Sequence, residues 1–271
     1  MAGTGKLGLR GYFGLLGEYF LQYLKVRVGY RGDFLIGLAT SFTATVFQLG
    51  FLVVLFSKIP LLADWRPDEV YFLYGFSLIP FGLFNVLSMN LYDFGNDYIM
   101  EGKFDRVLIR PVGSLFQVVF ETFRIESFQE VVTGTAVVLY AASKLHLRWN
   151  PIDALLFLGF VLCGATIYIS IFLILSTVSF WFEDRIGVHP PAWNLLAFGR
   201  YPLSIYSNYI QFFLSWMIPF GFATFYPSVR LLHRADFIHY APLVPVVAAA
   251  CLGAALLAWN NGVRHYSSTG S

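Results

Sequence analysis

The residue types that carry out chemistry are sparse in this sequence, and their spacing forms no catalytic site. The histidines stand in different connections, with no pair at metal-ligand spacing: His146, His189, His233, His239 and His265. The closest mixed set is Glu183, Asp184 and His189, which we interpret as a charged loop. The run GTGKL at residues 3–7 is similar to the end of a nucleotide-binding P-loop, but Leu7 stands where a Mg²⁺-binding hydroxyl is required. We therefore predict no catalytic residue, no metal site and no ATPase site in this chain.

Charged pairs at helical spacing precede the third long apolar stretch. Glu121 and Arg124 are three residues apart, and Glu126 and Glu130 are four apart, so each pair shares one face of a helix. Ionisable groups inside a bilayer are costly and usually functional. Arg124, Glu126 and Glu130 are thus candidates for lining a cavity or forming a gate. The alternative is a cytosolic amphipathic turn that leads into the membrane, and the sequence leaves both open.

The segment Asp93–Pro111 lies between two apolar stretches and carries seven charges: Asp93, Asp97, Glu101, Lys103, Asp105, Arg106 and Arg110. Within it, Phe104, Val107 and Leu108 fall at i, i+3 and i+4, which gives a short helix one apolar face. Pro111 is expected to end that helix. The pattern predicts a helix that docks against a partner, and the alternative is a plain polar turn.

The elements that hold these residues are apolar helices. The chain is 57% hydrophobic and only 13% charged, and its mean hydropathy is +0.65, far from the composition of a soluble domain. Cys163 and Cys251 lie inside apolar runs and behave there as small hydrophobic residues. The net charge of +2 does not favour nucleic acid as a partner. The composition predicts an all-α membrane protein embedded in a lipid bilayer.

Six transmembrane helices are predicted, at residues 34–57, 70–92, 123–145, 154–182, 203–226 and 237–259. Pro80 and Pro219 fall within the second and fifth, where we expect kinks. Residues 1–33 are predicted to form an amphipathic helix, because Leu9, Phe13, Leu16, Phe20 and Tyr23 share one face. This helix is expected to lie in the membrane interface, or alternatively to pack on a partner. Residues 260–271 are predicted to be a cytosolic tail.

Lys and Arg residues in the connections set the predicted orientation. With the N-terminus inside, 12 of the 18 are cytosolic: Lys6, Arg10, Lys25, Arg27, Arg31, Lys103, Arg106, Arg110, Arg124, Arg185, Arg200 and Arg264. The external residues are Lys58, Arg66, Lys144, Arg148, Arg230 and Arg234. Both termini are therefore expected in the cytosol.

Two short segments resemble parts of a known family. The first contains Gly102, Asp105, Leu108, Arg110, Pro111, Leu115 and Phe116. The second is FGRYPLSIY at residues 198–206, which contains the family-like motif Arg200, Tyr201 and Pro202. Both resemble segments of the ABC-2 type transporter permeases, in the six-helix branch whose permeases occur in pairs. The resemblance covers most of the chain, and its motifs are short.

The resemblance implies a function and partners. A separate ABC ATPase, acting as a dimer, would bind ATP and Mg²⁺ and push on a coupling element of this chain. That element is Gly102, Lys103, Phe104, Asp105, Arg106, Val107, Leu108, Arg110 and Pro111, within a coupling segment at residues 93–116. A second permease subunit, identical or homologous, would complete the transporter in the plasma membrane of a bacterium. The expected activity is export of a hydrophobic or amphiphilic substrate by alternating access.

Other interpretations remain open from the sequence alone. A non-transporting assembly or sensory subunit would use the same cytosolic loop to hold a different partner. A membrane enzyme is disfavoured by the missing catalytic cluster. Two external loops are candidates for an outer gate: the first holds Asp64, Arg66, Asp68 and Glu69, and the second holds Arg230, His233 and Arg234.

Overall fold

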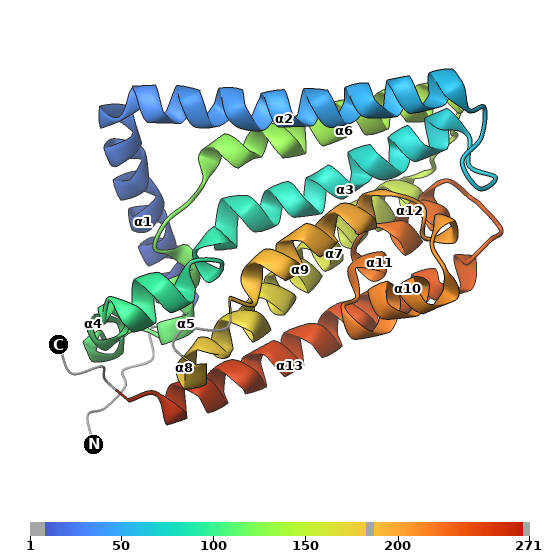
Figure 1. Cartoon of the computed structure of the whole chain (residues 1–271). Helices are drawn as coiled ribbons and strands as arrows, with labels where there is room; N and C mark the ends of the chain where they lie inside the picture. The colour runs from blue at the N-terminus through green and yellow to red at the C-terminus, as the bar shows by residue number, and fades with distance from the viewer. Residues whose placement is uncertain (1–8, 183–186, 268–271) are drawn as a thin grey trace.

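The chain is mainly helical in the part that the computed structural model describes, residues 9–182 and 187–267. Within these residues no strand forms, and one isolated bridge joins Leu62 to Trp65. Five long helices lie side by side along the length of this part (Figure 1): α2 (Arg31–Lys58), α3 (Pro67–Ser88), α6 (Phe128–Lys144), α7 (Pro151–Thr177) and α13 (Val244–His265). The predicted all-α fold class is confirmed for these residues.

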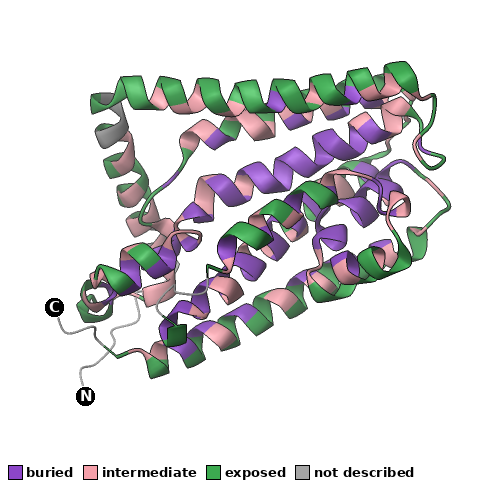
Figure 2. Ribbon diagram, in the orientation of Figure 1, coloured by how far each residue is buried: buried purple, intermediate pink, exposed green. Residues whose placement is uncertain are grey.

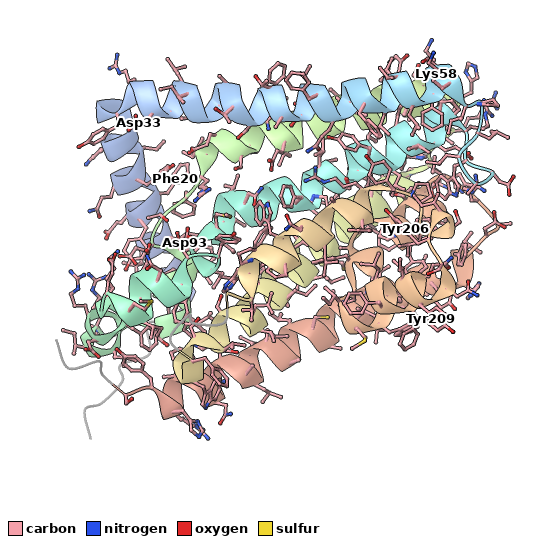
Figure 3. All side chains as sticks on the ribbon, viewed as in Figure 1. Phe20, Asp33, Lys58, Asp93, Tyr206 and Tyr209 are labelled. Atoms are coloured by element: carbon pink, nitrogen blue, oxygen red, sulfur yellow. The ribbon has the colours of Figure 1, made fainter. Side chains whose placement is uncertain are left out.

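Short elements gather at the two ends of the long helices (Figure 1). At one end, called the α4 end, lie α1 (Leu9–Gly29), α4 (Lys103–Ile109), α5 (Ser114–Phe120) and α8 (Ser179–Phe182). At the other, called the α12 end, lie α10 (Asn208–Phe212) and α12 (Phe225–Leu231). Asp33 and Asp93 lie toward the α4 end, whereas Lys58, Tyr206 and Tyr209 lie toward the α12 end (Figure 3).

Among the described residues, four helical stretches are long and apolar enough to cross a membrane: 31–58, 67–100, 151–182 and 238–265. They coincide with the first, second, fourth and sixth predicted spans. The second stretch includes a 3₁₀ turn at Met89–Leu91 and a π-helix at Gly95–Met100 after α3 ends. Pro80 lies inside α3, which continues through it. The last helix extends to His265, so the first part of the predicted tail is helical.

Local sequence signals explain where α3 and α7 begin. Pro67 and Pro151 occupy the first turns, where a missing N–H costs nothing. Glu69 Oε2 accepts the Arg66 backbone N–H at 2.8 Å, and Asn150 Oδ1 accepts the Asp153 N–H at 2.9 Å. Both helices are thus capped at the α12 end by side chains that satisfy otherwise unpaired amides.

The third predicted span begins later than expected. Residues 121–124 are not helical, a 3₁₀ turn covers Ile125–Ser127, and α6 has 17 residues, which is roughly 25 Å of helix. It packs closely on α3 because Gly75 and Gly134 face each other. A Cβ atom added to Gly134 would lie 2.6 Å from the Gly75 carbonyl oxygen, so no larger residue fits without separating the helices.

The structure differs most from the prediction at the fifth span, 203–226. Two helical pieces, Asn208–Met217 and Phe220–Leu231, meet at an angle of 71° around Pro219. The second piece consists of α11 (Phe220–Ala223) and α12. Tyr206 and Tyr209 lie toward the α12 end, and Arg234, just past the second piece, bonds to Glu69 at the same end (Figure 3). The pair therefore enters and leaves at one end as a re-entrant hairpin, because Pro219 interrupts the helix.

An irregular segment takes the place of a fifth continuous helix. It comprises α9 (His189–Leu195), a 3₁₀ helix η4 (Leu196–Arg200) and a 3₁₀ turn at Leu203–Ile205. The segment runs beside α7 toward the α12 end (Figure 1). Its free backbone carbonyls find partners: Thr224 Oγ1 donates to the Gly199 oxygen at 2.6 Å. Non-helical backbone can lie at membrane depth only when its N–H and C=O groups have hydrogen-bond partners within the protein.

Helix α1 forms within the predicted amphipathic segment and is turned across the α4 end of α2 (Figure 1). Phe20 and Tyr23 pack their rings against Phe123 at 5.5 and 6.0 Å, and Tyr12 packs against Phe116 at 4.9 Å. The face that meets the protein is therefore largely aromatic. Whether α1 lies in a membrane interface stays a prediction.

The long helices differ sharply in burial. In α3 and its continuation, 78% of the most apolar stretch is buried, compared with 11% in α2 (Figure 2). Helix α3 is the centre of the bundle, and α2 presents nearly all of its length to the surroundings. In a membrane those surroundings are lipid or another subunit.

Candidate functional site

The predicted docking helix exists as α4, but its apolar face is turned mainly inward. Phe104 is fully buried and Val107 is 5% exposed, whereas Leu108 is 43% and Ile109 83% exposed. The apolar face formed by Phe104, Val107 and Leu108 exists, but other parts of this chain cover its first two residues, and docking of the helix against a partner stays a prediction. An amphipathic pattern identifies a buried face without identifying what buries it.

Phe104 belongs to an aromatic cluster that joins α4 to the ends of three other elements. Its ring lies 5.8 Å from Phe94, 5.2 Å from Phe180 in α8, and 5.9 and 4.9 Å from Trp259 and Tyr266 near the end of α13. These edge-to-face contacts are each worth about 0.5–1.5 kcal/mol beyond burial. These ring contacts hold α4 against α8 and the end of α13.

The loop that follows α4 is held by a buried glutamine. Gln117 of α5 is 1% exposed, and its Nε2 donates to the carbonyl oxygens of Val107 at 3.0 Å and Val112 at 2.9 Å. Arg110, the last residue before Pro111, is extended and ends the helix as expected before a proline. The predicted helix end at Pro111 is confirmed.

Backbone geometry and hydrogen bonds also fix the start of α4. Gly102 has a φ of +68°, in the left-handed region that favours glycine. Lys103 Nζ lies 2.9 Å from Glu101 Oε2, and this hydrogen bond raises the pKa of Lys103. Tyr266 donates its hydroxyl to Asp105 Oδ1 at 3.1 Å. Burial and this bond raise the pKa of Tyr266 to about 12, so it remains a donor at neutral pH.

The structure does not bring Arg124 together with Glu126 and Glu130. Arg124 forms an ion pair with Asp93 at 3.8 Å, with both side chains about half exposed. Glu130 Oε2 accepts a hydrogen bond of 2.9 Å from Asn85 in α3. Glu126 lies against Gly37 of α2, with side-chain atoms 3.7 Å from a Cβ atom placed there. The 3₁₀ turn before α6 removes the continuous helical face on which their proximity was predicted.

A cavity of about 970 Å³ opens at the α4 end between α1 and the segment after α4. Tyr19, Tyr23 and Tyr30 line one part of it, and Arg110 and Arg124 line another. Arg110 of the predicted coupling element and Arg124 of the predicted gate thus line the same cavity, which combines aromatic rings with guanidinium groups. The aromatic and basic residues can be read from the sequence, but their proximity cannot, because it depends on the angle between α1 and α2.

Arg200 lies far from the cytosolic connection in which it was predicted. It ends η4, donates a hydrogen bond to Gln48 Oε1 in α2, and its guanidinium carbon lies 5.0 Å from the centre of the Phe81 ring. Tyr201 and Pro202 follow in extended backbone. The polar contacts of Arg200 are therefore made halfway along α2 and α3.

Charges at the α12 end join the two loops predicted to form an outer gate. Arg234 lies 2.9 Å from Glu69 Oε2 and 4.3 Å from the centre of the Trp65 ring, and it also donates to the Asp64 carbonyl at 3.4 Å. Asp153, at 1% exposure, lies 3.5 Å from Arg230. Sequence reasoning missed this anchoring role of Asp153, since a carboxylate in a first helical turn is usually only a cap.

The described residues contain no group of three His, Cys, Asp or Glu side chains placed to hold a metal ion. His189 is buried and lies near Ser176, with Nε2 3.3 Å from its hydroxyl oxygen. The P-loop-like residues 3–7, and Glu183 and Asp184, fall outside the described residues.

Comparison with known proteins gives one match. A family model described as "ABC-2 family transporter protein" matches residues 42–270. No curated protein and no solved structure matches the chain. The match covers both segments that carry the resemblance, around Gly102–Pro111 and Phe198–Tyr206.

Proposed function

The chain belongs to the ABC-2 transporter family, as a multi-pass permease subunit of an ABC transporter, and we propose that α4 is the element through which a separate ATPase drives it. The observation that carries this proposal is the two-sided character of α4. Its inner face is anchored by Phe104 in the aromatic cluster, and its outer face exposes Arg106, Leu108 and Ile109. A rigid helix with one anchored and one free face transmits a push.

The force has a defined route in this proposal. A displacement of α4 acts through Phe104 on Phe180 and Trp259, and hence on the ends of α7 and α13. It also acts on α3 through the π-helix Gly95–Met100 that directly precedes α4. Packed helices respond to such a push by moving as rigid bodies between discrete arrangements.

ATP and Mg²⁺ are assigned to the partner ATPase, which acts as a dimer. The one P-loop-like run of this chain has Leu7 where the Mg²⁺-binding hydroxyl belongs. The α4 end is placed in the cytosol of a bacterium, with the protein in its plasma membrane. Moving Arg200 out of the cytosolic set leaves eleven cationic residues inside against six outside, so the bias persists.

Transport itself is proposed to occur between two permease subunits, identical or homologous. Helix α2 is exposed over most of its length and offers the contact surface. Four helical stretches of the described residues are long and apolar enough to cross the membrane, and α6 and the irregular segment His189–Ile205 would bring the number of crossings to six. The substrate is proposed to be hydrophobic or amphiphilic and to be exported, in keeping with the aromatic interior.

The test changes the exposed face of α4 without touching its anchored face. The variant Ile109→Asp alters a side chain that is 83% exposed, and Ile152→Asp makes the same change on a side chain 64% exposed at the α12 end. We expect the partner ATPase to co-purify with the native chain and with Ile152→Asp, and to be lost or reduced at least tenfold with Ile109→Asp.

Two results would count against this function. Retention of the ATPase by Ile109→Asp would remove α4 as the docking element. A stable complex of the native chain that contains no nucleotide-binding subunit would instead favour an assembly or sensory subunit.

A further inference from the structure

Arg200 contacts the interior of α2, far from both ends of that helix, and this position corresponds to mid-depth if α2 spans a membrane. Its partner Gln48 lies, at about 1.5 Å per residue, roughly 15 Å along α2 from Lys58 and roughly 25 Å from Arg31. The hydrocarbon core of a bilayer is about 30 Å thick. The other contact, Phe81, lies in the interior of α3 beside Pro80. Charged residues at this depth are costly and generally serve the substrate path.

The neighbours that contact Arg200 are neutral. It donates to the amide oxygen of Gln48 and stacks on Phe81, and of the described residues none forms an ion pair with it. Glu130 is near enough for the two charges to interact, but its Oε2 accepts the Asn85 amide at 2.9 Å. The guanidinium therefore lacks the bidentate carboxylate partner that usually stabilises a cation away from water.

The site also has more hydrogen-bond donors than acceptors. Gln48 Oε1 already accepts from Tyr74 Oη at 2.8 Å and from Arg200. Among the described residues, no hydrogen bond uses the Gln48 amide nitrogen, and the Arg200 guanidinium bonds only to the neutral side chains of Gln48 and Tyr74. A guanidinium offers five N–H groups and accepts none. The group that matches this arrangement is rich in acceptors and negatively charged.

The site is open rather than sealed. Gln48 is exposed on the surface of α2, and Arg200 is only partly buried. This surface belongs to the helix that shows the least burial in the bundle. The buried rings of Phe81 and Tyr74 back the polar groups on the inner side. On α2, the exposed apolar side chains of Phe47 and Phe51 lie close to Gln48 in the sequence. An amphiphile with an anionic group meets both kinds of surface at once.

We propose that Arg200, oriented by Gln48, binds the phosphate, carboxylate or sulfate group of an amphiphilic molecule at mid-membrane. This inference rests on the proposed transport function, since it assigns an anionic charge to the cargo. Tyr74 is a positioning residue, because its hydroxyl orients the Gln48 amide toward the guanidinium.

The test measures bound amphiphile by native mass spectrometry of the full chain in a neutral maltoside detergent. The probes are lysophosphatidic acid and lysophosphatidylcholine of the same chain length, and inorganic phosphate as a competitor. We compare the native chain with Arg200→Gln, Arg200→Lys and the matched charge-removing control Arg148→Gln, an exposed arginine at the α12 end.

We expect the native chain and Arg148→Gln to bind lysophosphatidic acid at least tenfold more tightly than lysophosphatidylcholine. Arg200→Gln should lose that preference, and Arg200→Lys should keep part of it. Inorganic phosphate at equal concentration should not displace the lipid, because the acyl chain contributes to binding. If Arg200→Gln does not fold, Gln48→Leu carries the test and should weaken the preference severalfold.

Several outcomes would overturn the inference. Equal binding of the two lipids by the native chain, or an unchanged preference in Arg200→Gln, removes the anion site. Displacement by inorganic phosphate removes the assignment to an amphiphile. A loss of dimer in Arg200→Gln with unchanged lipid binding assigns Arg200 to a subunit contact. None of these affects ATPase co-purification, so failure of the transport function remains distinguishable.

Discussion

Replacing Phe104 by alanine tests whether α4 is held rigidly enough to transmit force. The side chain is fully buried, and its ring contacts four other aromatic rings at centroid distances between 4.9 and 5.9 Å. Loss of a buried phenylalanine costs about 3–5 kcal/mol. Because α4 is a short helix at the end of the bundle, most of this loss should appear as local opening of α4 rather than global unfolding.

The free-energy loss in Phe104→Ala determines how much faster the amides of α4 should exchange. A local loss of about 3 kcal/mol increases the open fraction of α4 by about 100-fold. Amide hydrogen exchange within Lys103–Ile109 should accelerate by a similar factor, while exchange in α3 remains unchanged. The coupled ATPase activity should fall without loss of ATPase binding, because the outer face of α4 retains its side chains.

The matched control is Ile109→Ala, which shortens a side chain that is 83% exposed. This variant should change the free energy of local opening of α4 by no more than about 0.5 kcal/mol, so the exchange rate should change by no more than about twofold. If exchange in α4 were equally slow in Phe104→Ala and the native chain, the aromatic cluster would not be what fixes α4. The proposed route of force through Phe180 and Trp259 would then have to be abandoned.

Three further predictions concern the ends of the bundle. Gly102→Ala should destabilise α4 by about 1 kcal/mol, because alanine is strained at a φ of +68°; unchanged exchange in α4 would contradict this. Arg234→Gln should cost about 1–3 kcal/mol in thermal unfolding, since it leaves the largely buried Glu69 without its partner, and Glu69→Gln in the same background should recover part of it. Tyr266→Phe should lose the bond to Asp105. Because the folded-state pKa of Tyr266 is raised to about 12, its contribution is complete below pH 10 and is lost as the pH rises to 12, so the native chain should lose stability there and the variant should not.

The long apolar helices were predictable because length and composition alone require them. No charge interrupts residues 34–57, and α2 covers them entirely. The re-entrant hairpin was not predictable in this way. Residues 203–226 are as apolar as a span, and the kink expected at Pro219 does not reveal that the chain turns back. Contacts between residues far apart in the sequence, such as the bond of Arg234 to Glu69, hold the second piece at the α12 end, and they form only in the folded bundle.

Some features of the candidate site could also be predicted from local sequence signals, and others could not. The helix Lys103–Ile109 and its end before Pro111 follow from local signals. The inward direction of Phe104 does not, because it needs Trp259, which is far away in the sequence. Arg200 was placed in a cytosolic connection because it falls between two predicted spans, 154–182 and 203–226. Its true depth depends on an irregular segment that no hydrophobic period predicts.

The contrast between α2 and α3 indicates where the bundle can move. Gly75 and Gly134 bring α3 and α6 so close that sliding between them would require backbone atoms to separate. Helix α2 has no such contact, and among its ties to the bundle are polar ones, from Gln48 to Tyr74 and Arg200. In lipid, apolar surface gains little from leaving its surroundings, so close packing and hydrogen bonds decide which helices stay together. A push on α4 should therefore move α3 and α6 as one body and rearrange the bonds of Gln48. An anionic group that competes for Arg200 would favour that rearrangement, which couples the occupied site to the motion of α2.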